Sequence, residues 1–449
     1  RLALQKGLNF IRVEPRISRN DRDLTLDIDF AINRGPRIFV ERIDIEGNVT
    51  TLDSVIRRQF TTVEGDPFNA RAIREAASRI RALGFFATSN VAAREGSSPD
   101  TVVIGVEVEE QPTGTLSFGL NYSVASGVGA VISFSETNFL GRGQYLSFSY
   151  SSGLDSSTMG FSFAEPAFLG RDVRFSISAS QSAADNLNSS LYQVSQLAFS
   201  TGLEFPAGEF SRIGLRYSAD QTDMYNYTGD STILAAEAAL GKQVTSSIGY
   251  TWARDTRGVG LNPEAGVLFR FTQDFAGVGG DSTFVRTEAL VAAEKLIFSE
   301  EVTLRAEFEG GLLSMISGDS RAPQRYFANA KIRGFDLNGI GPRDLASTAN
   351  EALGGNAFAV ARFEAEFPVG LPDEYGITAG VFADFGSVWM LDNTNGGAVD
   401  DGFHLRSAIG FSVFWDTAIG PLRFNFSRAL MKEAYDRERN FDLTISTRF

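Results

Sequence analysis

The sequence predicts a mostly β fold: a sixteen-stranded antiparallel transmembrane β-barrel preceded by small α/β domains of β-α-α-β-β order. Two observations support this prediction. Most of the chain, after Pro112, alternates apolar and polar residues with almost no helical periodicity. Such a two-residue period, repeated over many segments, is typical of outer-membrane strands that turn apolar residues to lipid and polar residues to the lumen. Before Pro112, the pattern is that of a small soluble αβ unit.

The bulk composition agrees with this class and argues against others. Hydrophobic residues make up 43% of the chain and mean hydropathy is −0.07, and there is no run of about 18 apolar residues that could form a transmembrane helix. The chain has no cysteine, which excludes disulfides and thiol chemistry. Its net charge of −14 argues against nucleic-acid binding. An acidic soluble protein is the alternative, and the extent of the alternation disfavours it.

Residues 1–34 resemble the C-terminal part of an incomplete domain. Leu2–Phe10 is expected to end a helix, and strands are expected at Phe10–Glu14 and Leu24–Asn33, around a turn at Asn20-Asp21. The chain starts at Arg1 without a methionine or a signal peptide, although a barrel protein must cross the inner membrane. We therefore expect a trimmed chain, whose number of domains is a lower bound.

Residues 35–111 contain the elements of a complete small domain. In order, these are a strand at Ile38–Ile45, a helix at Thr51–Phe60 that Asp53 could cap, a helix that begins after Asn69 and runs to about Leu83, and a hairpin of Phe86–Arg94 and Thr101–Glu109. Ile73, Ala76 and Ile80 share one face of the second helix, and Gly84 ends it. Glu110–Gly114 is the expected linker.

The barrel is expected at residues 115–449. Seventeen segments alternate, but Ile233–Leu240 is rich in alanine and glutamate and is better interpreted as a short helix in a surface loop. Sixteen strands remain, an even number, as a closed antiparallel barrel requires. Residues 313–356, approximately, show no clear alternation. Because loops of this length are usually functional or disordered, we expect a functional loop folded into the lumen.

Several short motifs occur in order in the second half of the chain. They are Lys331–Phe335 (K-I-R-G-F), Gly339–Pro342 (G-I-G-P), Leu353–Asn356 (L-G-G-N), Phe382–Trp389 (F-A-D-F-G-S-V-W) and Gly420–Phe424 (G-P-L-R-F). With the β-α-α-β-β unit and the barrel, they resemble the POTRA-plus-barrel superfamily of outer-membrane insertases and translocators. Within it, the chain is most similar to the insertases at the centre of the barrel assembly machine (BAM). The resemblance covers essentially the whole chain.

This resemblance implies an incomplete POTRA domain at 1–34 and a complete final POTRA domain at 35–111. It implies an assembly factor that folds and inserts β-barrel proteins into the bacterial outer membrane through a lateral gate, with its POTRA domains in the periplasm. The implied partners are unfolded outer-membrane barrel proteins, accessory BAM lipoproteins, periplasmic chaperones and the lipid bilayer, without nucleic acid, cofactor or enzymatic activity. The alternative is a TamA-like or two-partner secretion translocator. A passive porin or an outer-membrane enzyme fits the sequence less well.

The loop motif Ile332, Arg333, Gly334 and Phe335 is the first candidate site. Alternation in the strands that follow turns Glu364 and Asp384 to the lumen, and by the resemblance these carboxylates are the expected wall partners of Arg333. Arginine suits the role because its planar guanidinium group can make two hydrogen bonds to one carboxylate and stays charged. Gly334 would let the backbone approach the wall. The alternative is that Arg333 is a solvated loop charge.

The seam between the first and last strands is the second candidate site. The expected gate residues are Leu116, Phe118 and Leu120 of the first strand (Thr115–Ser123) and Phe441, Leu443, Ile445 and Phe449 of the last. A weak seam would expose an edge on which a client strand could pair. Ser446 stands where some relatives have a glycine that kinks the strand, so such a kink is not expected here.

Other polar residues are less informative. His404 is the only histidine, and without cysteine a metal site is not expected. Asp400-Asp401 is better interpreted as an exposed acidic loop than as a calcium site. Arg305, Glu307 and Glu309 could form a lumenal ladder of charges that contacts the loop, although an ordinary polar lumen is the favoured interpretation.

Overall fold

A computed structural model describes residues 11–20, 25–34, 38–123, 127–154, 156–185, 191–208, 210–257, 265–298, 301–417 and 420–446. The chain divides into two compact units, Arg1–Gly114 with Glu136–Tyr145, and Thr115–Ser135 with Leu146–Phe449. The two units are described in turn.

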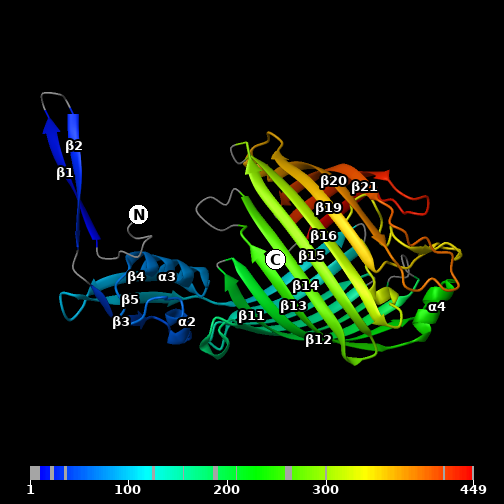
Figure 1. The fold of residues 1–449 in the computed structure, drawn as a ribbon, viewed down its shortest axis with the longest axis horizontal. Helices are drawn as coiled ribbons and strands as arrows, with labels where there is room; N and C mark the ends of the chain where they lie inside the picture. Colours follow the sequence, from blue (N-terminus) through cyan, green and yellow to red (C-terminus); the bar gives the residue numbers. More distant parts are fainter. Residues whose placement is uncertain are drawn as a thin grey trace. The chain divides into compact units, whose positions relative to one another are not determined.

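The first unit contains a three-stranded sheet and two helices (Figure 1). The elements are β3 (Phe39–Glu46), α2 (Asp53–Arg57), α3 (Ala70–Ala82), β4 (Phe86–Glu95) and β5 (Thr101–Glu110). β5 lies in the middle, parallel to β3 and antiparallel to β4. Val40, Ile56, Ile80 and Ile104 form the centre of the core, each at most 1% exposed. The predicted β-α-α-β-β order is confirmed.

The two helices differ in how well the sequence predicted their ends. The Asn69 side chain accepts hydrogen bonds from the Arg71 and Ala72 amides at 3.0 and 3.3 Å, which confirms it as the N-cap of α3. α2 spans only Asp53–Arg57, and its N-cap is Leu52. The predicted cap at Asp53 was wrong, because Asp53 is already helical and its carboxylate accepts a bond from Asn48 Nδ2 at 2.7 Å.

β1 (Ile11–Asn20) and β2 (Thr25–Arg34) form an antiparallel hairpin. β1 extends six residues beyond the predicted end at Glu14, because Pro15 and Ile17 face Phe30 and Ile28 and so continue the apolar pairing. The predicted helix end at Leu2–Phe10 lies outside the described residues.

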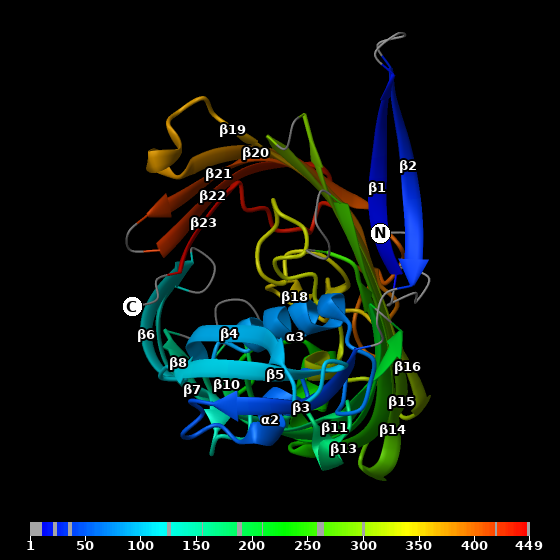
Figure 2. The same cartoon turned by 90° about the vertical axis from the view of Figure 1, so that its left-hand side faces the viewer.

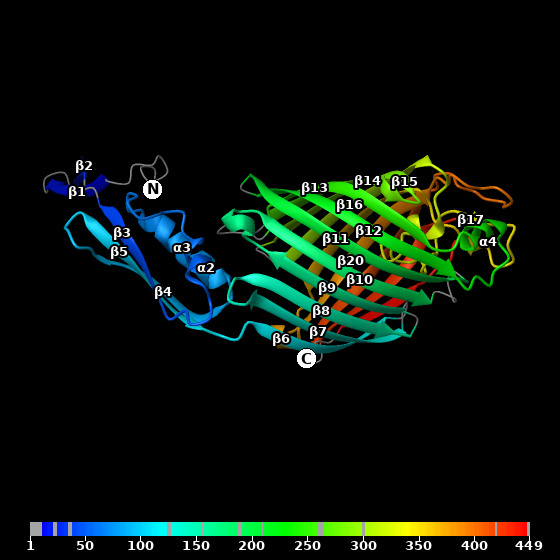
Figure 3. The same cartoon turned by 90° about the horizontal axis from the view of Figure 1, so that it is seen from below.

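The second unit contains most of the barrel: sixteen strands within the described residues form one antiparallel sheet closed into a barrel, which confirms the predicted fold class (Figures 1 and 3). The strands are β6 (Gly114–Ser123), β7 (Gly127–Phe139), β8 (Gln144–Gly153), β9 (Ser156–Glu165), β10 (Arg174–Asp185), β11 (Gln193–Gly208), β12 (Ser211–Tyr225), β13 (Gln243–Asp255), β14 (Ala265–Gly280), β15 (Thr283–Ile297), β16 (Val302–Ser317), β19 (Ala357–Pro368), β20 (Ile377–Trp389), β21 (Arg406–Thr417), β22 (Gly420–Met431) and β23 (Phe441–Ser446).

Neighbours in the sequence are neighbours in the barrel, and β23 meets β6 to close it. The segment 318–356 between β16 and β19, here called the lumenal loop, lies inside the ring of strands (Figure 2). Its own short strands, β17 (Arg343–Asp344) and β18 (Glu351–Ala352), form a separate two-stranded sheet. The loop begins after Ser317, because β16 continues to pair with β15 as far as that residue.

The segment expected to form a helix in a loop does so, as α4 (Thr232–Ala239) between β12 and β13. It is less exposed than expected: Ile233 and Leu234 are buried with Leu353 of the lumenal loop. The part of the chain that the structure describes also has short 3-10 helices at Phe168–Gly170, Ala322–Gln324 and Asp373–Tyr375. Among the described residues, no helix has the length and apolar character needed to cross a membrane.

Candidate functional site

The wall of the candidate site is made by β16, β19 and β20. In the register of these strands, Arg305 faces Glu364 and Arg362 faces Asp384. The residues between them point the other way: Phe363 is 40% exposed and packs edge-on against Phe308, with ring centroids 5.5 Å apart. Because successive side chains alternate between faces, Glu364 and Asp384 are on the lumenal side.

The structure brings Arg333 of the lumenal loop together with both carboxylates. Its Nε and Nη2 each donate to Asp384 at 2.7 Å, in a two-point pairing, and its backbone amide donates to the same carboxylate at 2.9 Å. Its Nη1 donates to Glu364 Oε2. The guanidinium also lies over the Phe382 ring, 3.6 Å from the centroid. The side chains of Arg333 and Asp384 are 15% and 0% exposed, so this is a largely desolvated ion pair.

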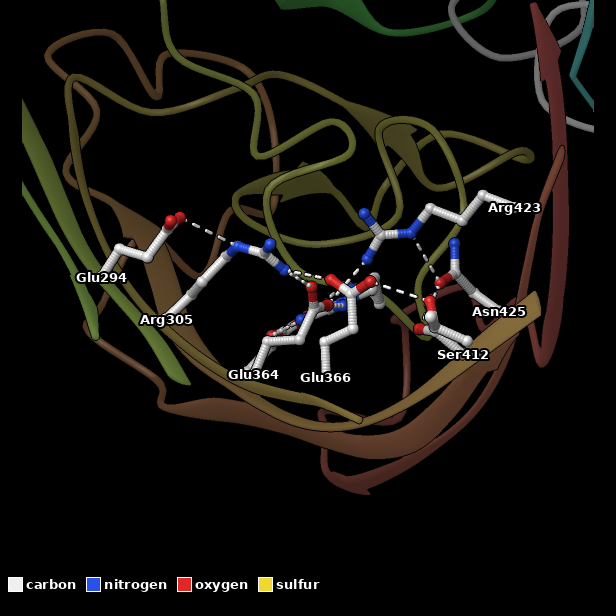
Figure 4. A network of polar contacts seen from close by, with 10 residues as sticks. Glu294, Arg305, Glu364, Glu366, Ser412, Arg423 and Asn425 are labelled. Carbon is white, nitrogen blue, oxygen red and sulfur yellow. Dashed lines mark hydrogen bonds and ion pairs between the residues drawn. The ribbon is translucent and has the colours of Figure 1, made fainter. Parts of the chain in front are cut away.

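Glu364 lies between two further arginines, Arg305 of β16 and Arg423 of β22 (Figure 4). Arg423 Nη2 donates to Glu364 Oε2 at 2.8 Å, and Arg305 Nη1 is 3.7 Å from Glu364 Oε1. Arg423 belongs to the G-P-L-R-F motif, but sequence reasoning gave it no role. Its position among the lumen-facing residues of β22 was the signal that could have identified it.

The other residues of the loop motif fix its backbone against the wall. Ile332 is buried against Phe358 and Val388, and Phe335 packs at the edge of the same cluster. Gly334 has φ +92°, and a Cβ there would be 2.9 Å from the Cβ of Ala408. Only glycine combines that conformation with such a close approach.

The charges on β16 also contact the lumenal loop. Glu309 accepts a bond from Lys331 Nζ at 2.5 Å, while Glu307 pairs with Arg362 of the wall. Arg305 bonds Glu366 at 2.5 Å and Glu294 at 3.2 Å. These residues therefore form a ladder of charges that contacts the loop at Lys331.

The seam is the second part of the site. In the described residues, β23 and β6 share three register pairs: Thr444 with Ser123, Ile445 with Tyr122, and Ser446 with Asn121.

The predicted gate residues lie on the two strands of the seam. Leu116, Phe118 and Leu120 are 51–58% exposed on β6, and Phe441 and Leu443 lie on β23. Ile445 lies within the register, and Phe449 lies outside the described residues.

A buried polar contact between α4 and the lumenal loop was not predicted. Arg325 and Glu237 form an ion pair at 2.6 Å, with side chains 0% and 4% exposed. The Glu237 carboxylate also accepts a bond from the Ala322 amide at 2.8 Å. The alternation that revealed the strands carries no information about such contacts between loops, so sequence reasoning missed them.

Arg343 is another buried cation of the lumenal loop and is 1% exposed. It donates to the carbonyl oxygens of Asn350, at 2.9 Å, and Asn338. Burial, together with nearby Arg437, lowers the pKa of Arg343 to about 10, so the group is still charged at neutral pH. Arg343 therefore holds two turns of the loop together through their carbonyl groups.

Metal binding has no support in the described residues, where no group of three or more His, Asp or Glu side chains is arranged to hold an ion. His404 Nε2 lies 2.9 Å from Asp400 and its Nδ1 3.4 Å from Glu433. The hydrogen bond from His404 lowers the pKa of Asp400.

Comparison with known proteins supplies the family. Residues 138–449 match the Omp85 superfamily domain, and residues 38–111 match the POTRA model described as a surface antigen variable number repeat. The chain belongs to the Omp85 superfamily.

The most similar relatives of this Omp85 chain include two outer membrane protein assembly factors named BamA. That of Neorickettsia risticii is 26% identical over 446 residues, covering 99% of this chain and 60% of the relative. That of Nitratidesulfovibrio vulgaris is 26% identical over 441 residues, covering 97% of this chain and 54% of the relative. This Omp85 chain thus spans little more than half the length of these curated relatives.

Among solved structures, BamA of Haemophilus ducreyi lacking POTRA domains 1–3 has the same fold. It aligns with a TM-score of 0.80 at 23% identity, covering 99% of this Omp85 chain and 91% of that structure. The likeness shows that the arrangement of a POTRA domain before a sixteen-stranded barrel is shared.

Proposed function

We propose that this chain is an outer-membrane protein assembly factor, which folds β-barrel proteins and inserts them into the membrane through a lateral gate between β6 and β23. The observation that carries the proposal is the seam itself, where the barrel closes by pairing of its first strand, β6, with its last strand, β23. Full closure stabilises an ordinary barrel, because each unsatisfied backbone group in lipid costs several kcal/mol. A lateral gate would have to break this one pairing of strands to admit a client.

The proposed mechanism is strand templating. Separation of β23 from β6 exposes a row of backbone donors and acceptors, on which an unfolded client strand can pair by β-augmentation. The client gains hydrogen bonds that it cannot make in lipid, and folding of the client in the bilayer supplies the driving force. The chain itself carries out no bond-making chemistry in this scheme.

The proposed setting follows from the family. We place the barrel in the bacterial outer membrane and the POTRA domains, 35–111 and the incomplete one at 1–34, in the periplasm. The proposed partners are unfolded outer-membrane barrel proteins, accessory BAM lipoproteins, periplasmic chaperones and the lipid bilayer. The POTRA sheet also has edges on β3 and β4 that could pair with an extended client.

The loop site has a supporting role in this proposal. Arg333, paired with Glu364 and Asp384, ties the lumenal loop to the wall formed by β19 and β20. We propose that this pairing keeps the loop in one position in the lumen and so sets the shape of the barrel beside the seam.

The proposal predicts that the chain accelerates folding of a client barrel. Vesicles that contain the purified chain should fold a urea-denatured outer-membrane barrel protein faster than empty vesicles do, measured by the heat-sensitive electrophoretic mobility of the folded client. A chain that inserts normally but leaves the folding rate at that of empty vesicles would exclude an assembly role for these 449 residues.

The alternative is a TamA-like or two-partner secretion translocator. The same vesicles distinguish it from an assembly factor. A translocator would move a soluble extended substrate across the bilayer into protease-protected space, whereas an assembly factor should leave the client embedded in the membrane.

A further inference from the structure

The loop motif pairs with a second segment that lies directly before the seam. Residues 432–440, between β22 and β23, are here called the last loop. The Asp336 amide donates to the Arg437 carbonyl at 2.9 Å, and the Arg437 amide donates to the Gly339 carbonyl at 2.9 Å. The Arg439 amide donates to the Gly334 carbonyl at 3.0 Å, and Phe335 and Glu438 form an antiparallel bridge. The backbone of the motif is therefore bonded to the residues that lead into β23.

Arg439 is the centre of this junction. Its Nη2 donates to Asp336 of the lumenal loop, and its Nη1 lies 3.9 Å from Asp442 of β23. Its carbonyl accepts a bond from Ser427 Oγ of β22 at 3.1 Å. The side chain is 19% exposed. One residue thus contacts the lumenal loop, β22 and β23.

The middle of the last loop is anchored to the barrel. Arg406 and Asp436 form an ion pair at 2.9 Å with side chains 1% and 0% exposed, which anchors the loop to β21. Residues 437–440, which bond to the lumenal loop, therefore lie between this anchor and the start of β23.

A cavity connects the motif with the seam strand. It has a volume of about 450 Å³, and both Arg333 and Gly334 of the motif and Asp442 and Thr444 of β23 line it. Thr444 is the residue that faces Ser123 across the seam. The loop motif and the seam strand therefore share one lumenal space.

We propose that the last loop is a strap that couples the lumenal loop to the seam, with Arg439 as its positioning residue. The proposal deepens the lateral-gate function and rests on it. The three backbone bonds of the strap lie directly before β23, next to its first register pair with β22 (Phe426 with Phe441), and so help to hold the start of this strand. Displacement of the lumenal loop breaks these bonds and loosens β23 beside β6.

The test measures the seam directly. Ser123→Cys and Thr444→Cys are introduced into the full chain, which has no other cysteine, and the rate of disulfide formation under mild oxidation is recorded. Adding Arg439→Asp should lower this rate by about tenfold, as expected for loss of a charge-assisted hydrogen bond. Adding Asp336→Arg to that variant should restore the rate, because the opposite charges are then exchanged. Lys432→Ala is the matched control: it removes a cation from the same loop, whose partner Glu438 is also in the loop.

An Arg439→Asp rate equal to that of Lys432→Ala overturns the proposal, and so does failure of Asp336→Arg to restore it. If Arg439→Asp does not fold, Arg439→Gln, which removes only the charge, is measured against the same control. Client assembly is assayed in parallel. Loss of client assembly with an unchanged rate of disulfide formation across the seam contradicts the strap but leaves the proposed function standing. A changed rate of disulfide formation with normal client assembly supports the strap and counts against the lateral gate.

Discussion

Arg333→Ala should destabilise the attachment of the lumenal loop by about 3 to 5 kcal/mol, the usual cost of removing one partner from a buried ion pair. The substitution leaves Asp384, which is 0% exposed, without the two guanidinium bonds that it accepts. Glu364 keeps Arg423 and Arg305, so most of the cost falls on Asp384. Urea unfolding and the rate of protease cleavage within residues 318–356 should both report the change, and client assembly should fall with them.

Two further variants make this result specific. Arg333→Lys keeps the charge but cannot pair at two points, and it should fall between wild type and alanine. Lys331→Ala removes a neighbouring cation whose pair with Glu309 is partly exposed, at 29% and 23%, and it should change stability by less than about 1 kcal/mol. If Arg333→Ala were no less stable than Lys331→Ala, the ion pair would not be what holds the loop.

A disulfide between Ser123→Cys and Thr444→Cys should abolish client assembly, and a reductant should restore it. The two residues face each other in the register of the seam, and the introduced pair is the only one that can oxidise. A covalent bond there prevents β23 from leaving β6, so no edge becomes available to a client. The assay is client folding in vesicles before and after reduction.

The matched control is a disulfide between two strands that are not expected to separate. Ser178→Cys and Ser200→Cys face each other on β10 and β11, which share twelve register pairs. This disulfide should leave assembly unchanged. Normal assembly by the oxidised seam variant, with its disulfide confirmed, would show that the seam does not open during the reaction.

The sequence predicted the parts of the site that depend on alternation. Glu364 and Asp384 could be assigned to the lumen because the local alternation of apolar and polar residues shows which side chains of a strand face the lumen. Arg333 was identified by its motif. The structure brings these three side chains together. That they carry the function remains a prediction, which the Arg333 variants test.

The contacts that sequence reasoning missed join segments far apart in the chain. Arg439 and Asp336 are 103 residues apart, and Arg325 and Glu237 are 88 apart. No period relates such positions, because the path of a loop in the lumen depends on packing against the completed barrel. The prediction of the α2 cap was wrong for a different reason. The N-cap and the first helical residue differ by one position, and sequence patterns do not locate a helix end to a single residue.

The central claim is that β6 templates the strand of a client, and disulfide trapping of a folding client tests it most directly. Ser117→Cys on β6 is combined with single cysteines at successive positions in the terminal strand of an unfolded barrel client. Templating predicts trapping at every second client position, the period of a paired strand, and little trapping by the control Ser180→Cys on β10, which is paired on both sides. Trapping without a two-residue period, or equally at both sites, would contradict the account.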